Sequence, residues 1–283
     1  MQNDFAVFIL THGRAKQQKT LSTLLKCGYT GPLFLVIDDE DDQGPLYKKL
    51  YGDRVLTFSK QHVEKHFDTM TNQKEYRSVV YARNASYALA LERGIRFIFM
   101  CDDDISNLSF RVVRDGKLKG FNIQNINRLF EAMTEYMRSA NLGILGFSQA
   151  GAFIGGANSK KYQEGCQRNC AQAMMFDAHH PILFRGIFNE DLQVALDAGT
   201  AGKVVLSTML VSITSPERTT NTGGLHDLYK ANSTYTPCFY TLMAYPGVAR
   251  IENNGPDFRL RLSHNAFAPL ILSDKHRKRD ADA

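Results

Sequence analysis

The sequence lacks any apolar run that approaches the roughly 20 consecutive residues a membrane-spanning helix needs. Residues 1–10 also lack the basic segment and the cleavage site of a secretory signal peptide. These two absences predict a soluble protein of cytoplasmic type with no membrane partner.

Cysteine is scarce, and the five cysteines are odd in number and scattered along the chain. Cys166 and Cys170 are close in sequence, but no second pair or nearby histidine completes a zinc site. We therefore predict reduced thiols, with neither a disulfide framework nor structural zinc.

No linker, internal repeat or low-complexity segment divides the 283 residues. A chain of this length can bury a sizeable core as two small domains or as one large α/β domain. Since nothing marks a boundary, we expect one domain over residues 1–270 and a basic, flexible tail over 271–283. The net charge of +5 and the basic cluster at 275–279 are compatible with a nucleic-acid partner, although a solvated terminus explains the tail equally well.

The most informative stretch is an apolar run, residues 97–101, that ends abruptly in Asp102, Asp103 and Asp104. A short apolar run that follows a helical pattern is typical of a buried strand in an α/β sheet. The three carboxylates then lie at the carboxyl end of that strand, where open α/β sheets bind ligands. They favour a bound Mg²⁺ or Mn²⁺ that carries a phosphorylated substrate, and the simpler alternative is an acidic turn.

Strand and helix patterns alternate along the chain. Residues 5–10 and 33–37 predict two parallel strands, because a helical pattern that ends at Gly28 connects them. The fold class is therefore α/β, with a mostly parallel central sheet flanked by helices. Further strands are expected at 55–58, 97–102, 142–147 and 203–209, with a hairpin over 110–119 and a helix through 123–137. Residues 173–176 begin a further segment that leads to the helix after Asn189.

Two predicted helix starts carry candidate site residues. Asn84 is a suitable N-cap, and it would place Arg83 where a helix N-terminus meets solvent and can bind phosphate. Asn189 can cap a later helix, with Glu190 and Asp191 in its first turn. The bland interpretations also stand, because a lone arginine is often an ordinary surface residue and first-turn acids are often only partners of the helix dipole.

Five motifs follow one another at strand ends and helix starts. They are residues 11–14, the acids Asp38 and Asp39, residues 82–84, the three acids Asp102 to Asp104, and residues 189–191. Taken together and in this order, they resemble a nucleotide-sugar-dependent glycosyltransferase of the GT-A fold, with Asp102 to Asp104 as its version of the DXD motif. Downstream, residues 220–230, 245–248 and 261–264 are similar to the TET-associated glycosyltransferases of bacteriophages, which are thought to glycosylate hydroxymethylated pyrimidines in phage DNA.

The resemblance implies a single Rossmann-like GT-A domain and metal-dependent transfer of a sugar from a UDP-sugar to 5-hydroxymethylcytosine in DNA. If a phage encodes the protein, it would act in the host cytoplasm. The implied cofactor is Mn²⁺ or Mg²⁺, which would be held by Asp102, Asp104 and His264, with His226 as the rival histidine. Asp191 would be the general base of an inverting reaction and Glu190 would assist it, whereas a retaining enzyme would not need that base.

The resemblance also implies a set of substrate-binding residues, in which Arg83 would meet the diphosphate and Asp102 would reach the ribose or the metal. Residues 148–170 are expected to form a loop that covers the site, and His179 and His180 are assigned to a loop that borders the acceptor. The substrate-binding set is Thr11, His12, Arg14, Asp38, Asp39, Arg83, Asp102 and Arg185.

Three alternatives remain open. The chain could be a GT-A transferase that modifies a glycan or a protein, or a nucleotidyltransferase on a similar sheet. It could also be a nucleic-acid-binding module that kept the fold without turnover. Transfer from UDP-sugars to hydroxymethylated DNA, compared with unmodified DNA and a glycan panel, separates these alternatives.

Overall fold

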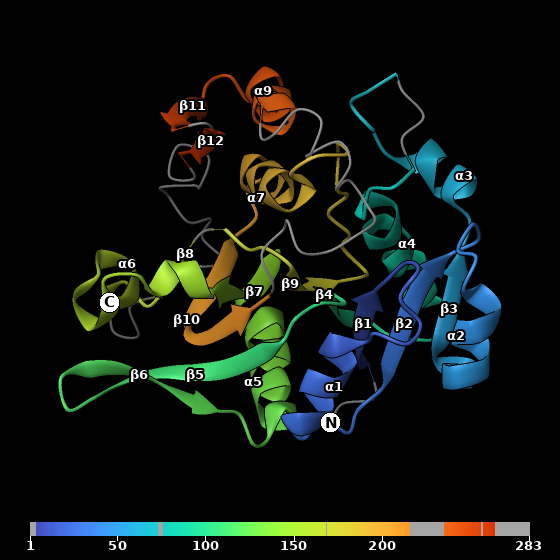
Figure 1. The fold of residues 1–283 in the computed structure, drawn as a ribbon, viewed down its shortest axis with the longest axis horizontal. Coiled ribbons are helices and arrows are strands. Elements are labelled where there is room, and N and C mark those ends of the chain that lie inside the picture. Colours follow the sequence, from blue (N-terminus) through green and yellow to red (C-terminus); the bar gives the residue numbers. More distant parts are fainter. Residues whose placement is uncertain (1–3, 73–75, 168, 216–234, 256, 264–283) are drawn as a thin grey trace, which may run out of the picture.

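The computed structural model describes residues 4–72, 76–167, 169–215, 235–255 and 257–263 (Figure 1). The predicted tail over 271–283, the motif at 220–230 and both candidate histidine ligands, His226 and His264, lie outside these described residues. Within them, no helix is long and apolar enough to cross a membrane.

The described residues form a ten-stranded sheet in the order β3-β2-β1-β4-β9-β7-β10-β5-β6, with β8 paired to β10. The strands are β1 (Phe5–Leu10), β2 (Leu33–Asp38), β3 (Val55–Phe58), β4 (Phe97–Asp102), β5 (Asn107–Arg114), β6 (Lys117–Asn122), β7 (Ile144–Gln149), β8 (Cys166–Gln167), β9 (Ala173–Asp177) and β10 (Val205–Thr214).

Most of the long strands in this sheet run in one direction. β1 pairs in parallel with β2 and β4, β2 with β3, and β7 with β10. β9 is antiparallel to both β4 and β7, so β4 and β7 also point the same way. The predicted α/β fold with a mostly parallel sheet is therefore confirmed, and the carboxyl ends of β1, β2, β4 and β7 share one edge.

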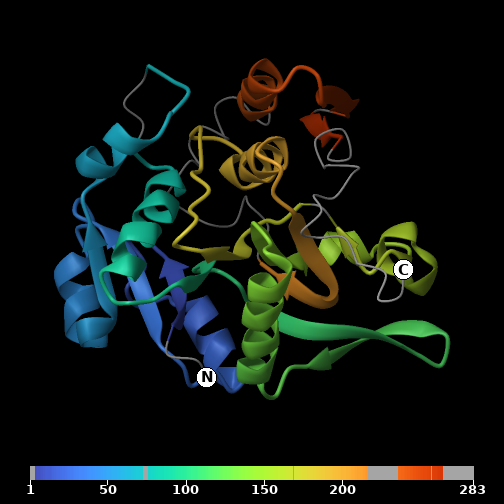
Figure 2. The same ribbon diagram turned by 180° about the vertical axis from the view of Figure 1, so that it is seen from behind.

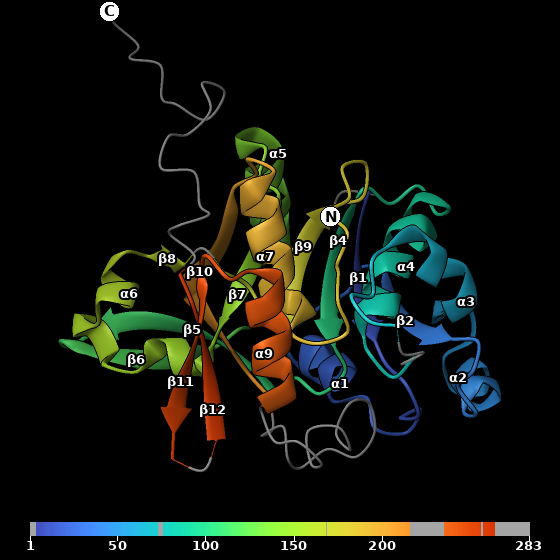
Figure 3. The ribbon, with the colours of Figure 1, turned by 90° about the horizontal axis from the view of Figure 1, so that it is seen from above.

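Helices cover both faces of the sheet because side chains alternate between the faces along each strand. In β1 the odd-numbered residues pack with α1 and α5, and the even-numbered residues pack with α4 and α7 (Figures 1 and 3). The helices are α1 (Lys19–Lys26), α2 (Gly44–Tyr51), α3 (Lys60–Val63), α4 (Val80–Leu91), α5 (Ile126–Ala140), α6 (Lys160–Gln163), α7 (Glu190–Thr200) and α9 (Tyr235–Ala244).

Two features project from this layered body. β5 and β6 form a hairpin that extends beyond the rest of the sheet, with its tight turn at Asp115 and Gly116, as predicted (Figures 1 and 2). A separate two-stranded sheet, β11 (Ala249–Asn254) and β12 (Asp257–Leu262), follows α9. It packs through Tyr245 and Val248 onto Leu196 of α7.

Both predicted N-caps differ from the structure. α4 begins at Val80, so Asn84 lies inside the helix, where its amide exchanges two 2.9 Å hydrogen bonds with the backbone of Phe184. Asn189 does precede α7, but with a φ of 53° and without a side-chain cap. Its amide nitrogen instead donates to the carbonyl of Pro237 on α9. Both asparagine side chains therefore hydrogen-bond to residues distant in sequence, Phe184 and Pro237, instead of capping their helices.

Candidate active site

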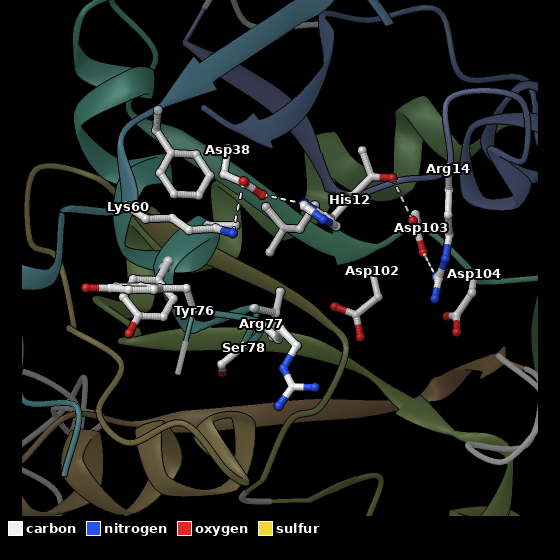
Figure 4. Close-up of a pocket in the computed structure, with 16 residues that line it drawn as sticks. His12, Arg14, Asp38, Lys60, Tyr76, Arg77, Ser78, Asp102, Asp103 and Asp104 are labelled. Atoms are coloured by element: carbon white, nitrogen blue, oxygen red, sulfur yellow. Dashed lines mark hydrogen bonds and ion pairs between the residues drawn. The ribbon is translucent and has the colours of Figure 1, made fainter. Parts of the chain in front are cut away.

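A cavity of about 380 Å³ opens where the carboxyl ends of β1, β2 and β4 meet (Figure 4). The strand register pairs Leu10 with Val36 and with Asp102, which brings the residues after each strand side by side. The structure thus gathers six predicted site residues around one space, although they come from three strands. They are Thr11, His12, Arg14, Asp38, Asp102 and Asp104.

Asp38 anchors one end of the cavity. Its carboxylate accepts a hydrogen bond from Lys60 Nζ at 2.9 Å and lies 2.6 Å from Nδ1 of His12 (Figure 4). Burial alone raises the pKa of Asp38, but the hydrogen bonds from His12 and Lys60 outweigh it and lower the pKa overall. Hydrogen bonding to Asp38 raises the pKa of His12. Asp39 is exposed and does not line the cavity, so of these two acids Asp38 is the one placed to accept hydrogen bonds from a ligand.

Asp103 binds two other residues that line the cavity, Thr11 and Arg14. Its carboxylate lies 2.6 Å from Arg14 Nη1 and accepts a hydrogen bond from Thr11 Oγ1, also at 2.6 Å. The backbone carbonyl of Asp103 accepts from the N–H of Thr20 at the start of α1. Asp103 is therefore engaged by the protein itself.

Asp102 meets a buried arginine. Arg83 Nη2 donates to Asp102 at 2.9 Å, and Arg83 Nε donates to Glu190 at 3.1 Å. Burial raises the pKa of Asp102 to about 7, and although Arg83 opposes this shift, Asp104 and the acids of α7 add to it. The Asp102 side chain is 27% exposed and lines the cavity.

The position of Arg83 corrects a prediction. The sequence predicts it at an exposed helix start, but α4 begins three residues earlier and Arg83 is only 1% exposed. It does not line the cavity, and it supports Asp102 from beneath. Its Nη1 atom is buried without a hydrogen-bond acceptor among the described residues.

The acids of α7 lie on the same side as Arg83. Glu190 is 8% exposed, and burial together with repulsion from Asp191 raises its pKa, while Arg83 opposes the shift. Asp191 is partly exposed, and its Oδ1 accepts the backbone N–H of Leu192 at 2.9 Å. The charge of Asp191 contributes to the raised pKa of Asp102, which places the predicted base within electrostatic reach of the triplet.

Arg185 lies outside this group. Its guanidinium makes two hydrogen bonds to the carboxylate of Asp197, at 3.0 and 2.8 Å, and a third to Tyr245 Oη. Because it does not line the cavity, its predicted contact with the substrate has no support in the geometry.

His179 and His180 follow the end of β9, where Asp177 pairs with Phe97 at the start of β4. They lie at the opposite end of the strands from Asp102 and do not line the 380 Å³ cavity, so their predicted place beside the acceptor has no support in the geometry. Residues 148–170 are also more ordered than the predicted loop, since they include α6 and β8. None of them lines the 380 Å³ cavity.

Sequence reasoning missed three residues that line the cavity, namely Lys60, Tyr76 and Arg77. Lys60 follows β3 at the same sheet edge, so a cation after that predicted strand was a usable signal. Arg77 and Tyr76 precede α4 in a segment without periodicity, and nothing in the pattern distinguishes them. Figure 4 shows the Arg77 guanidinium on the same side of the cavity as Asp102.

The chemistry of the donor set fits a divalent metal. Asp102 and Asp104 both line the cavity with carboxylate oxygens, the ligands that Mg²⁺ and Mn²⁺ prefer. Burial is the main cause of the raised pKa of Asp102 and repulsion from Asp104 adds to it, so a bound cation would favour the ionised carboxylate. The part of the chain that the structure describes holds no complete cluster of three or more acidic, histidine or cysteine ligands. A metal here would draw further ligands from the substrate, from water or from residues beyond those described.

Comparison with known proteins now defines the class. The chain belongs to the TET-associated glycosyltransferase family, whose model matches residues 5–224. It is therefore a glycosyltransferase, and the resemblance seen in the sequence is confirmed at the level of the family.

Three solved structures are similar to this chain at low sequence identity. Glucosyl-3-phosphoglycerate synthase from Mycobacterium tuberculosis, crystallised with Mg²⁺ and uridine diphosphate, is 10% identical with a TM-score of 0.47, over 92% of this chain and 86% of that chain. A putative nucleotide-diphospho-sugar transferase from Desulfovibrio desulfuricans G20 is 9% identical with a TM-score of 0.38, over 86% and 95%. S. aureus TarS 1-349 is 14% identical with a TM-score of 0.39, over 84% and 65%. No curated protein sequence matches the chain significantly.

The buried Asp102 predicts a particular pH dependence of stability. Its pKa of about 7 lies above the ordinary value of 3.8, so the folded protein binds a proton that the unfolded chain releases. This contribution to stability is fully present below the unfolded pKa and is lost as the pH rises through the folded pKa. In metal-free buffer, urea denaturation should show that the unfolding free energy of the wild type falls relative to Asp102→Asn between about pH 4 and pH 8.

The exposed Asp42 provides a matched control, since Asp42→Asn removes an acid from the same edge without touching the triplet. Its stability should follow the wild type across the range. A wild-type and Asp102→Asn difference that stays constant with pH would contradict the assignment.

Proposed function

We propose that this glycosyltransferase moves a sugar from a UDP-sugar to the hydroxymethyl group of a modified pyrimidine, such as 5-hydroxymethylcytosine, in DNA. The observation that carries the proposal is the meeting of Asp38, Asp102 and Asp104 at one cavity at the carboxyl ends of parallel strands. That edge is the ligand-binding position of open α/β sheets.

The uridine would occupy the Asp38 end of the cavity. Asp38 stays ionised under the influence of His12 and Lys60, so it can accept hydrogen bonds from the ribose hydroxyls or the uracil N–H. Phe58 and Tyr76 line the same cavity and supply the apolar surface that a base packs against.

The diphosphate would lie toward Asp102 and Asp104. Arg77 lines this part of the cavity and is exposed, whereas Arg83 is buried and supports Asp102 instead. We therefore assign the direct phosphate contact to Arg77 and a positioning role to Arg83. A Mn²⁺ or Mg²⁺ ion held by Asp102 and Asp104 would supply Lewis-acid stabilisation of the leaving diphosphate.

Asp191 is the proposed general base. Glu190 is buried and bound to Arg83, whereas Asp191 is partly exposed and uses only Oδ1 in its hydrogen bond to Leu192. Asp191 Oδ2 would take the proton of the acceptor hydroxyl as that oxygen attacks the anomeric carbon and the bond to the diphosphate breaks. Attack from the face opposite the diphosphate inverts the anomeric centre, so a retained configuration in the product would argue against this role.

A DNA acceptor is supported by the charge of the β5–β6 hairpin. Residues 107–122 contain only one acid, Asp115, against four basic residues. α6 lies beside the hairpin, since Tyr162 Oη donates to the carbonyl of Arg111, and adds two exposed lysines. Such a basic surface attracts the phosphate backbone of DNA, whereas a neutral glycan would gain little from these charges. These basic residues are Arg111, Arg114, Lys117, Lys119, Lys160 and Lys161.

Two substitutions separate the proposed roles of the acids. Asp104→Ala removes a metal ligand, and Asp191→Asn removes the base while preserving its shape. In assays with Mn²⁺, a mixture of UDP-sugars and hydroxymethylated DNA, each should reduce transfer by about a hundredfold or more. Mass spectrometry of the DNA reports the gain of a sugar and its identity.

Asp191→Asn should retain Mn²⁺-dependent binding of UDP, measured by calorimetry, and Asp104→Ala should lose it. Asp53→Asn, an exposed acid on the far side of β3, is the control and should behave as wild type. An unchanged transfer rate in Asp104→Ala would remove the metal role. Transfer to a glycan panel with no transfer to hydroxymethylated DNA would favour the alternative acceptor.

The hairpin generates a prediction about DNA binding. Reversing two charges near its tip, Arg114→Glu with Lys117→Glu, should weaken binding to duplex DNA. It should also lower the slope of log Kd against log salt by about 1 for each phosphate that the variant no longer neutralises, measured by fluorescence anisotropy. Lys48→Glu with Lys49→Glu on α2, near the β3 edge of the sheet, changes the net charge equally. If both pairs weaken binding to the same extent, the hairpin has no specific role.

A further inference from the structure

A second cavity, of about 300 Å³, shares no lining residue with the donor cavity. A short segment separates it from the donor cavity. Cys170 and Ala171 line the second cavity, and the carbonyl of Gln172 accepts the backbone N–H of Asp102 at 3.1 Å. Residues 170–172 therefore lie between the two cavities, because Cys170 and Ala171 line the second cavity and Gln172 is hydrogen-bonded to the backbone of Asp102.

Asp191 lies in the first turn of α7. Burial is the main cause of the raised pKa of Cys170, which lines the second cavity, and the negative charge of Asp191 is a smaller cause. The second cavity and α7 also share a face of the sheet, because Cys170 and the α7 residue Val194 belong to the same buried cluster. The second cavity is thus linked to α7, the helix that carries Asp191, through this buried cluster.

The floor of the second cavity is built by β7 and β10. Their pairing shifts register between Thr208 and Ser212, an irregularity of the kind that often re-aims side chains beside active sites. Ser148 is 2% exposed and donates to the carbonyl of Thr208 at 2.8 Å. Gln167 Nε2 donates in turn to Ser148 Oγ at 3.3 Å, so the polar floor is ordered by its own hydrogen bonds.

The lining chemistry selects a class of ligand. Three amide side chains, Gln149, Gln167 and Asn169, offer both donors and acceptors, and Lys161 and Arg259 add two exposed cations. No aspartate or glutamate is present among the described residues that line this cavity. Amides match the alternating donors and acceptors of a nucleobase edge, and the cations match a phosphate. A glycan, which offers many hydroxyl donors, would instead be suited by carboxylate acceptors.

We propose that this second cavity is the subsite for the acceptor nucleotide, with the hydroxymethylated pyrimidine against the amides and its phosphates toward Lys161 and Arg259. The assignment rests on the proposed function, because it presumes a DNA acceptor. A base inside a duplex cannot reach a cavity of this kind, so the nucleotide leaves the stack and enters it. For transfer, the hydroxymethyl group extends past residues 170–172 until its oxygen comes within hydrogen-bond reach of Asp191.

Two variants test the assignment. Gly151 lines the cavity, has no neighbour within 4 Å of a Cβ atom and lacks a positive φ, so Gly151→Phe can add a ring without straining the backbone. Gln167→Ala removes one amide. The control is Gln163→Ala, an exposed glutamine on α6 that does not line the cavity.

The experiment measures, for each variant, transfer to a hydroxymethylcytosine oligonucleotide and hydrolysis of the UDP-sugar by water without acceptor, both with Mn²⁺. We expect the ratio of transfer to hydrolysis to fall about tenfold or more in Gly151→Phe and Gln167→Ala, mainly through a higher KM for the oligonucleotide. Gln163→Ala should keep the wild-type ratio.

A wild-type ratio in both cavity variants would overturn the assignment and leave the proposed function standing, because the oligonucleotide would still be glycosylated. Equal losses of transfer and hydrolysis would also overturn it, since the cavity would then serve the donor. Hydrolysis by the wild type with no transfer to any hydroxymethylated oligonucleotide would overturn the proposed function, and the assignment with it.

Discussion

The site depends on the ion pairs that the buried guanidinium of Arg83 forms with Asp102 and Glu190. Arg83 joins Asp102 at the end of β4 to Glu190 at the start of α7, and it is itself only 1% exposed. Removing charges from water is costly, and replacing such pairs by apolar residues is often neutral or stabilising. Arg83 is thus better explained by what it positions: it fixes the acid that faces the donor cavity and the turn that carries Asp191.

The three acids at the end of β4 and in the turn after it have different partners. Asp103 points toward α1 and is occupied by Arg14 and Thr11, so it stabilises the loop after β1. Asp102 points to the opposite face, toward α4 and α7, and together with Asp104 remains on the cavity. The end of β4 is thereby bonded to two parts of the site. Asp103 binds the loop after β1, and Asp102 is linked through Arg83 to Glu190, the neighbour of the proposed base. Both acids that line the cavity offer carboxylate oxygens, which suit a divalent metal with a diphosphate.

Features that depend on local pattern could be predicted from the sequence. The strands that end at Leu10, Asp38 and Asp102 were predicted to within one residue, because an apolar run that stops in polar residues is a strong signal. The GT-A resemblance followed from the motifs at these strand ends, and the family followed from short motifs further along the chain. Features that depend on tertiary partners could not. Asn84 has the right chemistry for a cap, but Phe184, a hundred residues away, takes its amide. The guanidinium of Arg185 likewise donates hydrogen bonds to Asp197 instead of reaching the cavity. Arg77 does line the cavity, but it lies in a segment without a periodic pattern.

A double-mutant cycle on Arg83 and Glu190 tests the central claim most directly. Arg83→Met leaves two buried acids without their cation, Glu190→Gln leaves a neutral partner, and the free energy of unfolding is measured by urea denaturation for both variants and for their combination. We predict that Arg83→Met alone is destabilised by about 3–5 kcal/mol. We also predict that the double variant is more stable than the sum of the single effects implies, with a coupling of about 1 kcal/mol or more. Additive effects would contradict this claim, because they would show that Arg83 does not hold the two elements together through its charge.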